Sequence, residues 1–409
     1  MTDLVSGLLE ALHDIDNSTL GVAVSGGGDS MALLHMLAKR GAGLRAVTVD
    51  HGLRDESAAE AAMVAEACRS IGVPHTTVKW ENWDRSGNLQ DEARRARIRL
   101  ISGWASEQNI RHVALGHTMD DQAETVLLRL ARGSGVDGLS GMAARRVDGP
   151  LTWVRPLLHA RRGDLREYLS AEGIDWIDDP SNEDPKYNRV KARQALEVLG
   201  SLGIDAKGMA ATAGRMRDAR VALEYATAAL ADACVEVSDA GEVRINAPVF
   251  NAAPDEIRFR LLAASLQWIS GAPYRPRFDS LRNLLGSALE NGQTLHGCII
   301  RSHSGSIVVR REPARVEAPA LLTDVWDHRW IVTARGEGDA DRIATLGESG
   351  LKLCENWRET GHAREVLLAS AAVWANNTLI AAPMAGLANG WSITLKEGKK
   401  GLHKSLMTR

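Results

Sequence analysis

The sequence predicts an α/β protein that begins with a doubly wound parallel sheet and continues into helical and mixed α+β domains. Short β-rich runs alternate with amphipathic helical stretches over the first half of the chain. After about residue 190 this alternation fades and longer helical segments follow. Short strands return from Gly297 to Arg310, and a small mixed region runs from about Asp324 to a basic tail that ends at Arg409.

The length of the chain favours three domains. Its 409 residues exceed what one hydrophobic core usually organises. We expect an N-terminal domain at 1–195, a middle domain at 196–315 and a C-terminal domain at 316–409. The composition, 44% hydrophobic and 25% charged, excludes wholesale disorder and fibrous architectures. No apolar run approaches the roughly 20 residues of a membrane helix, and residues 1–10 lack the features of a signal peptide. We therefore expect no membrane partner and a cytoplasmic location.

The elements of the first domain follow from periodicity. We expect strands at Leu20 to Ser25, Leu44 to Asp50, His75 to Trp80 and His112 to Gly116. The first helix carries Leu33, Leu34 and Leu37 on one face and ends at Gly41, and the second runs from Asp55 to Gly72. In the middle domain, Ala210 to Ala231 and Pro254 to Ile269 are predicted helices. Because ligands bind at the carboxyl ends of parallel strands, the residues after each strand locate the site.

Four cysteines, Cys68, Cys234, Cys298 and Cys354, lie far apart without a CxxC pair. This spacing excludes zinc ribbons, iron–sulfur clusters and sulfur-relay chemistry on neighbouring thiols. The net charge of −3 does not exclude a nucleic-acid-binding protein, because binding of phosphates needs only a local basic surface.

A glycine-rich loop, Ser25-Gly26-Gly27-Gly28-Asp29-Ser30, joins the first strand to the first helix. Glycines let backbone N–H groups approach phosphate oxygens, and the helix N-terminus adds positive potential. The Asp29 carboxylate would repel phosphates unless a Mg²⁺ ion lies between them. The loop therefore predicts a phosphate site with magnesium, against the alternative of a plain glycine-rich turn.

Two other phosphate loops compete with this interpretation. A Walker loop requires a lysine that is absent here, whereas a dinucleotide fingerprint GxGxxG nearly fits. Gly26 and Gly28 match, Met31 replaces the third glycine, and Asp50 follows about 20 residues on, where a ribose-binding acid would lie. An NAD-dependent oxidoreductase on a Rossmann sheet is therefore a second hypothesis. Asp29 argues against it.

An acidic helix start follows the fourth predicted strand. Asp120, Asp121 and Glu124 lie within one helical turn, so their carboxylates converge near the phosphate loop and are candidates to bind magnesium. The structural alternative is that Thr118 caps the helix and the aspartates complement its dipole.

Two segments, SGGGDS and HTMDDQAETVLLRLARGSGVDGLSGM, together resemble the tRNA(Ile)-lysidine synthetases, a branch of the N-type ATP pyrophosphatases or PP-loop proteins. Further resembling segments are residues 49–54, Asn88 to Arg99, residues 155–158, 178–182 and 295–298, and the stretch Trp357 to Gly386. Two positions depart from the family pattern. Thr118 stands where many members have a second histidine, and Val190 stands where asparagine is common.

The resemblance implies that the domain at 1–195 is an ATP-binding catalytic domain with an adenine nucleotide alpha hydrolase-like sheet. It also implies a ligase that forms a carbon–nitrogen bond. It implies that ATP, with Mg²⁺, adenylates the wobble cytidine of a tRNA(Ile) with the anticodon CAU, and that L-lysine then displaces AMP; a homodimer is also compatible with it. The implied catalytic residues are Asp29, Arg97, Asp120, Asp121 and Glu124, and the implied metal ligands are Asp29 and Asp121. The implied ATP-binding residues are Ser25, Gly26, Gly27, Gly28, Asp29, Ser30, Asp50 and His51, and the implied tRNA-binding residues are Arg94, Arg129 and Arg132. The later domains resemble tRNA-binding domains, which would have to reject the methionine tRNAs that carry the same anticodon.

Several roles stay open from sequence. Asp121, Glu124 and Asp137 are all candidates to bind the lysine amine and take its proton. Arg94 and Arg97 share a helix face that would otherwise be solvated, with Asp91 paired to Arg95. Position alone equally allows His51 and Arg54 to cap a loop, and Arg161 and Arg162 either to contact tRNA or to be solvated. A third hypothesis, a sulfur-inserting tRNA enzyme, is excluded by the cysteine spacing.

Overall fold

The structure is a computed structural model, and it describes residues 2–13, 15, 19–39, 43–53, 56–81, 89–178, 186–287, 289–322, 325–334, 336 and 339–407. Among the positions named above, Gly41, Arg54, Asp55, Asn88, residues 179–182, Asp324 and Arg409 lie outside these residues. The described residues form two compact units, which divide between Arg220 and Val221. The boundary falls inside one long helix, α9 (Ala206–Cys234). The three-domain division with boundaries at 195 and 315 stays a prediction.

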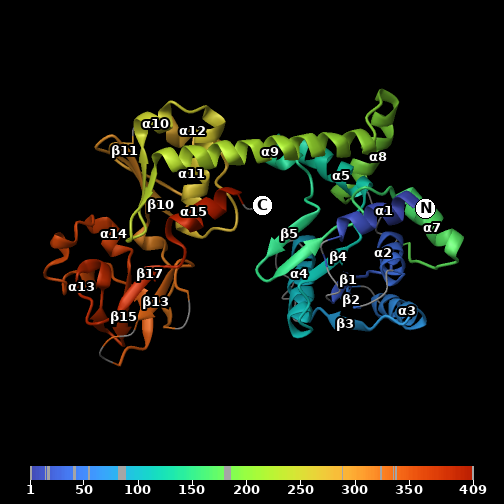
Figure 1. Cartoon of the computed structure of the whole chain (residues 1–409), viewed down its shortest axis with the longest axis horizontal. Helices are drawn as coiled ribbons and strands as arrows, with labels where there is room; N and C mark the ends of the chain where they lie inside the picture. Colours follow the sequence, from blue (N-terminus) through green and yellow to red (C-terminus); the bar gives the residue numbers. More distant parts are fainter. Residues whose placement is uncertain are drawn as a thin grey trace. The chain divides into compact units, whose positions relative to one another are not determined.

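The first unit contains a six-stranded sheet with the order β3-β2-β1-β4-β6-β5 (Figure 1). Its strands are β1 (Leu20–Ala23), β2 (Leu44–Asp50), β3 (His75–Lys79), β4 (His112–Leu115), β5 (Arg145–Asp148) and β6 (Leu151–Val154). All neighbours are parallel except β5, which pairs antiparallel with β6 at the edge. The four predicted strands are confirmed to within two residues, whereas the short β5–β6 hairpin was not predicted.

Helices cover both faces of this sheet, as the doubly wound fold requires (Figure 1). On one face, α1 (Thr2–Ala11), α2 (Gly28–Ala38), α3 (Ser57–Ser70) and α7 (Arg162–Glu172) share a core with alternate strand residues such as Val22 and Ala114. On the other face, α4 (Leu89–Glu107) packs against the intervening residues, including Val47 and Val113. The side chains of a strand alternate between the two faces, so each strand contributes to both cores.

The strand order reverses between β1 and β4. The loops that follow these two strands therefore diverge at the carboxyl edge of the sheet, where open α/β sheets bind ligands. The loop after β1 leads into α2, and the loop after β4 leads into α5 (Met119–Leu130). The remaining helical elements of this unit are α6 (Val136–Leu139), α8 (Asn188–Leu199) and the turn η2 (Gly200–Leu202).

The second unit has an antiparallel sheet with the order β7-β8-β11-β10-β9. The strands are β7 (Val235–Val237), β8 (Val243–Asn246), β9 (Gln293–Leu295), β10 (Cys298–His303) and β11 (Ser306–Arg311). Its helices are α10 (Ala247–Asn251), α11 (Asp255–Ser270), α12 (Phe278–Leu285) and, from the end of the chain, α15 (Gly398–Met407). The predicted helices 210–231 and 254–269 are confirmed within α9 and α11, as are the strands within 297–310.

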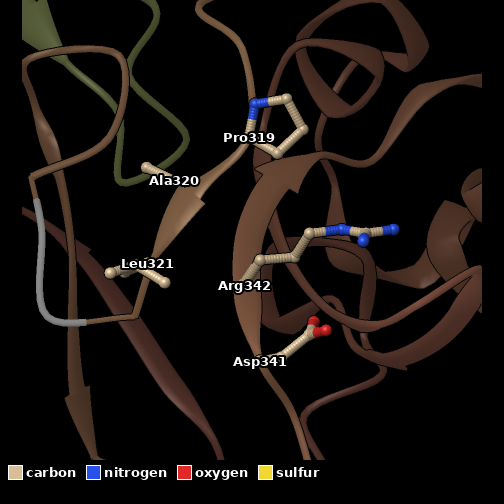
Figure 2. A pocket seen from close by; sticks show the side chains of 5 residues that line it. All are labelled: Pro319, Ala320, Leu321, Asp341 and Arg342. Carbon is tan, nitrogen blue, oxygen red and sulfur yellow. The ribbon is translucent and has the colours of Figure 1, made fainter.

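The rest of the second unit is mixed α+β, as predicted. One sheet has the order β12-β14-β15-β16 and a second pairs β13 with β17. The elements are η3 (Pro313–Arg315), β12 (Ala320–Leu321), β13 (Trp330–Ala334), β14 (Arg342–Thr345), α13 (Gly347–Leu351), η4 (Trp357–Thr360), α14 (Arg364–Leu368), β15 (Ala371–Ala375), β16 (Thr378–Ala381), η5 (Pro383–Ala385) and β17 (Ser392–Leu395). Figure 2 shows an open hollow beside β12 and β14, lined by Pro319, Ala320, Leu321, Asp341 and Arg342. Within the described part of the chain, no helix is both long and apolar enough to cross a membrane.

Candidate active site

The glycine-rich loop lies at the carboxyl end of β1 and opens α2. Gly26 has φ +87°, and a Cβ there would also lie 2.6 Å from the Ile177 side chain, so the position requires glycine. The backbone at Gly27 is more open, because a Cβ there would meet no atom closer than 3.6 Å. Gly27 is also the N-cap of α2 and offers no side-chain cap. The first N–H groups of the helix therefore have no side-chain cap and lie beside open space at Gly27, which suits an anion.

Hydrogen bonds within the loop fix its shape. The Ser25 N–H donates to Ser30 Oγ at 3.1 Å, and the Ser30 hydroxyl donates to the Gly27 carbonyl at 2.8 Å. The Ile177 N–H donates to the Gly26 carbonyl at 2.9 Å, and Trp176 lies against Gly28. The loop is thus held before any ligand binds, so little ordering would be needed when it grips phosphates.

The helix after β4 begins with a capping box. Thr118 Oγ1 accepts from the Asp121 N–H at 3.3 Å, while Asp121 Oδ2 accepts from the Thr118 N–H at 2.8 Å and from its hydroxyl at 2.9 Å. The structural alternative considered for Thr118 is therefore confirmed. Thr118, which stands where many family members have histidine, therefore orients the Asp121 carboxylate and also caps the start of α5.

One cation lies among the acidic residues, and it belongs to the protein. Arg162, at the start of α7, donates through Nε to Asp29 at 3.0 Å, through Nη2 to Asp121 at 3.1 Å and through Nη1 to Glu124 at 3.4 Å. Burial lowers the pKa of Arg162, but the carboxylates of Asp121, Asp29 and Glu124 outweigh burial and raise it, so the guanidinium stays charged. Arg162 is therefore an ion-paired arginine and not a solvated one, while its contact with tRNA stays a prediction.

Glu124 has two different oxygens. Its side chain is 2% exposed, and Oε1 accepts from both Arg162 and Arg193 Nε, the latter at 3.1 Å. Oε2 is buried and has no hydrogen-bond partner among the described residues. A buried carboxylate oxygen without a donor is costly, so this atom is suited to a cationic ligand or a ligand N–H.

Asp121 differs from Glu124 because both of its oxygens are engaged. Oδ1 faces Arg162 and, at 3.6 Å, Arg189, while Oδ2 faces Thr118. Burial would raise the pKa of Asp121, but Arg162 and the Thr118 N–H outweigh burial and the pKa is lowered. Asp29 shows the opposite balance, since burial raises its pKa against the pull of Arg162.

A basic side completes the site. Burial, Arg94 and Arg189 together lower the pKa of Arg97, so these three cations lie within electrostatic reach of one another. Burial lowers the pKa of His117 to about 3, which keeps its imidazole neutral. His51 lies edge-on to Trp80 at 5.7 Å, and burial followed by Arg97 lowers its pKa. Clustered arginines beside a phosphate loop favour a polyanionic substrate.

The other predicted residues have different surroundings. Asp120 turns away from the carboxylate cluster, where it accepts from Arg161 Nη2 at 3.1 Å and from the Arg162 N–H at 2.7 Å. Convergence was therefore predicted correctly for Asp121 and Glu124 and wrongly for Asp120. Asp50 Oδ1 accepts from the Ser57 hydroxyl and the Gly52 N–H, which lower its pKa and tie down the loop after β2.

The predicted tRNA-contacting arginines also differ from one another. Arg129 Nη1 donates to the carbonyls of Gly138 and Gly141 at 2.8 and 2.9 Å, so it holds the loop after α5. Arg132 is exposed, and so is Arg94. Arg95 pairs with Glu92 at 2.6 Å. Arg189 and Arg193 were not among the predicted site residues, because no local pattern shows that segments far apart in sequence meet here.

The residues present fit ATP phosphates with magnesium. Gly27 leaves an open cradle at a helix N-terminus, and Asp29 offers hard carboxylate oxygens beside it. Arg162 Nε donates to Asp29 Oδ2, so a metal ion would bind through Oδ1 of Asp29. Among the described residues, the one set of three or more side chains placed to hold a metal lies elsewhere, at Glu317, Asp327 and His328.

Comparison with known proteins agrees with this geometry. The PP-loop domain family matches residues 2–198. A tRNA(Ile)-lysidine synthase of Ruegeria pomeroyi is 46% identical over 99% of this chain and 98% of its own length. Synthases of the same name from Wolbachia pipientis and Bradyrhizobium sp. are 34% and 36% identical over 90% and 75% of this chain, and 89% and 91% of their own lengths. None of these relatives is an oxidoreductase, so the NAD hypothesis finds no support in them. With such identity along its whole length, the chain belongs to the tRNA(Ile)-lysidine synthase family of PP-loop proteins.

Proposed function

We propose that this protein is a cytoplasmic ligase that joins L-lysine to C2 of the wobble cytidine in a tRNA(Ile) with the anticodon CAU. The observation that carries this proposal is the 46% identity over 99% of the chain to a tRNA(Ile)-lysidine synthase. The site supports it, since a phosphate loop, an acidic cluster and a basic side meet at one edge of the sheet. A homodimer stays a prediction.

In the first step, the cytidine O2 attacks the α-phosphorus of ATP and the bond to pyrophosphate breaks. The backbone of residues 25–30 and the N-terminus of α2 bind the departing phosphates, where negative charge develops. Mg²⁺, when bound, neutralises part of that charge, with Asp29 as its best-placed ligand because Asp121 is engaged on both oxygens. Arg97 and Arg189 bind the α-phosphate or the RNA from the basic side.

In the second step, the lysine ε-nitrogen attacks C2, and AMP leaves with the oxygen that came from the cytidine. The amine must first lose a proton, because its ordinary pKa is about 10.4. Of the three candidates, Glu124 is best placed to bind the ammonium and take that proton, since its Oε2 is buried and lacks a donor. Arg162 and Arg193 hold the other oxygen and so orient Oε2.

Transfer of labelled lysine tests the function. The purified protein, ATP, Mg²⁺, labelled lysine and a CAU-anticodon tRNA(Ile) should give labelled RNA, with AMP and pyrophosphate in equal amounts. Glu124→Gln should still release pyrophosphate but lose label transfer by at least about 100-fold, whereas Asp29→Asn should lose both. If folded protein and intact tRNA give no label, the lysine assignment is wrong. If Asp29→Asn keeps pyrophosphate release, the metal role of Asp29 is wrong.

A further inference from the structure

An ion-pair seam joins two parts of the second unit. The seam consists of Glu242, Arg310, Arg311, Asp327, Arg329 and Glu365. We call residues 235–315 with α15 the middle part, and residues 316–397 the C-terminal part. Each part contributes both acids and arginines to the seam.

The centre of the seam is a buried bidentate pair. Arg311 from β11 donates through Nε to Asp327 Oδ2 at 2.9 Å and through Nη2 to Oδ1 at 2.7 Å, and the two side chains are 6% and 0% exposed. Arg311 Nη1 also donates to the Gly297 carbonyl, and Asp327 Oδ1 accepts from the Glu317 N–H. Such a pair fixes both distance and direction between the elements that carry it.

Two flanking contacts repeat this arrangement. Arg310 binds the buried Glu242 within the middle part and reaches Glu365 of α14 at 3.2 Å. Arg329 of the C-terminal part donates in return to the Gly241 carbonyl at 2.9 Å. The contacts therefore run in both directions between the parts.

The chain also crosses between the two parts a second time. After β17 it returns as α15, whose Leu402 and Leu406 lie in the same core as Leu261 of α11 (Figure 1). The C-terminal part is thus tied at both of its ends as well as along the seam. Asp327 also lies near Glu317 and His328 in a set that could hold a cation, but Arg311 already neutralises it, so this set carries no metal proposal.

Stability alone does not explain a buried seam of charges. Replacing a buried ion pair by apolar side chains is often neutral or stabilising, whereas apolar contacts tolerate sliding that a bidentate pair forbids. Fixed geometry is therefore what the seam supplies. A tRNA that contacts both parts would meet their surfaces at one spacing only.

We propose that Arg311 and Asp327 are positioning residues that lock the middle and C-terminal parts into one rigid RNA-reading body. This inference rests on the proposed function, because it takes tRNA as the ligand of both parts. It also offers a route to specificity. Discrimination against methionine tRNAs with the same anticodon must use features elsewhere in the RNA. A rigid body would contact such features only where their spacing in the RNA matches the fixed spacing of the two parts.

The test replaces both partners of the bidentate pair, while Arg329, which lies 3.8 Å from Asp327, keeps its hydrogen bond to the Gly241 carbonyl. Arg311→Met with Asp327→Leu should fold and keep kcat and the KM for ATP and lysine within about twofold. The KM for tRNA(Ile) should rise about fivefold or more, and discrimination against a CAU-anticodon methionine tRNA should fall. The matched control is Arg364→Met with Glu348→Leu, an exposed pair in the same unit, which should behave as the wild type. If the double variant does not fold, Arg311→Lys keeps the charge, loses the two-bond geometry, and should raise the tRNA KM in the same way.

A distance measurement separates this inference from the proposed function. Spin labels at Asn283→Cys and Lys352→Cys lie on exposed positions of the two parts, and the four native cysteines are buried and so react slowly. The wild type should give one narrow distance distribution, and the Arg311→Met, Asp327→Leu variant a broader one. An unchanged distribution, or an unchanged tRNA KM despite a broader one, overturns the inference. Failure of the wild type to transfer lysine overturns the proposed function, while the distances still report whether the body is rigid.

Discussion

Arg162 is the residue on which the acidic side of the site depends. It contacts acids from two different segments, and no local pattern indicates these contacts because Arg162 lies 133 positions from Asp29. The acids themselves were predictable, since they follow strands of one sheet and lie one helical turn apart. A cation that reaches them from α7 is a property of tertiary packing alone.

Replacing Arg162 should destabilise the first unit. Arg162→Gln leaves Asp29, Asp121 and Glu124 close together without their shared cation, and since Arg162 is 20% exposed we expect a loss of about 2 kcal/mol in unfolding free energy. Pyrophosphate release should fall at least about 100-fold. Urea unfolding and a pyrophosphate assay measure the two effects. Arg161→Gln, which breaks an exposed pair with Asp120, is the control and should cost less than about 0.5 kcal/mol. Wild-type stability and rate in Arg162→Gln would contradict this role.

His117 should make stability depend on pH. Burial lowers the pKa of His117 from 6.5 to about 3, so below pH 6.5 the unfolded chain binds a proton that the folded chain refuses. Its contribution to stability is complete above pH 6.5 and is lost as pH falls toward 3. Compared with His117→Gln, the wild type should lose up to about 1.4 kcal/mol more per pH unit below pH 6.5. Denaturant unfolding between pH 6.5 and 4.5 measures this, and equal slopes in both proteins would contradict it.

At the scale of elements, the sequence predicted what local periodicity determines. The four strands and the long helices were found because apolar residues recur with the period of each structure. The β5–β6 hairpin was not predicted because its strands are four residues long and show no clear alternation of apolar and polar residues. Asp120 was misplaced for a related reason. Helical spacing shows that Asp120 and Glu124 are one turn apart but not which neighbour each one contacts.

The loop after α5 separates two arginines that looked equivalent in sequence. Arg129→Gln frees the carbonyls of Gly138 and Gly141 and should lower the unfolding free energy by about 1 kcal/mol.

Arg132 is exposed, and if it binds an RNA phosphate, Arg132→Gln should lower the slope of log affinity against log salt by about 0.7 to 0.9. Filter binding at several salt concentrations and urea unfolding measure both variants. A reduced salt slope in Arg129→Gln would instead favour a direct RNA contact for Arg129.

At the scale of the whole molecule, the chain is two units connected through α9. Sequence reasoning placed a boundary near residue 195, where strand–helix alternation ends, whereas the compact units divide at residue 220. The end of the strand–helix alternation indicates where the sheet ends, but it does not show that the following helices still pack in the same unit. Helix α9 begins within the first unit, where Arg217 donates to the carbonyls of Ser140 and Met142. Such contacts between distant segments have no local signature.

The two units should unfold separately and respond differently to nucleotide. We expect two calorimetric transitions. A non-hydrolysable ATP analogue with Mg²⁺ at about 100 times its Kd should stabilise the first unit by about 2.7 kcal/mol and leave the other transition in place. A single transition, or an equal shift of both, would show that the units unfold as one cooperative body.

The contact between Trp176 and Gly28 gives this molecule an optical reporter. The indole lies against the backbone of the phosphate loop, is partly exposed, and donates through Nε1 to Asp178 at 3.3 Å. Phosphates in the loop would bring negative charge and displace water beside this ring, so its emission intensity and wavelength should change on nucleotide binding. Subtracting the Trp176→Phe spectrum isolates that signal from the other ten tryptophans among the eleven in the chain. The rate of ATP binding can then be measured by stopped-flow fluorescence, without RNA and without turnover.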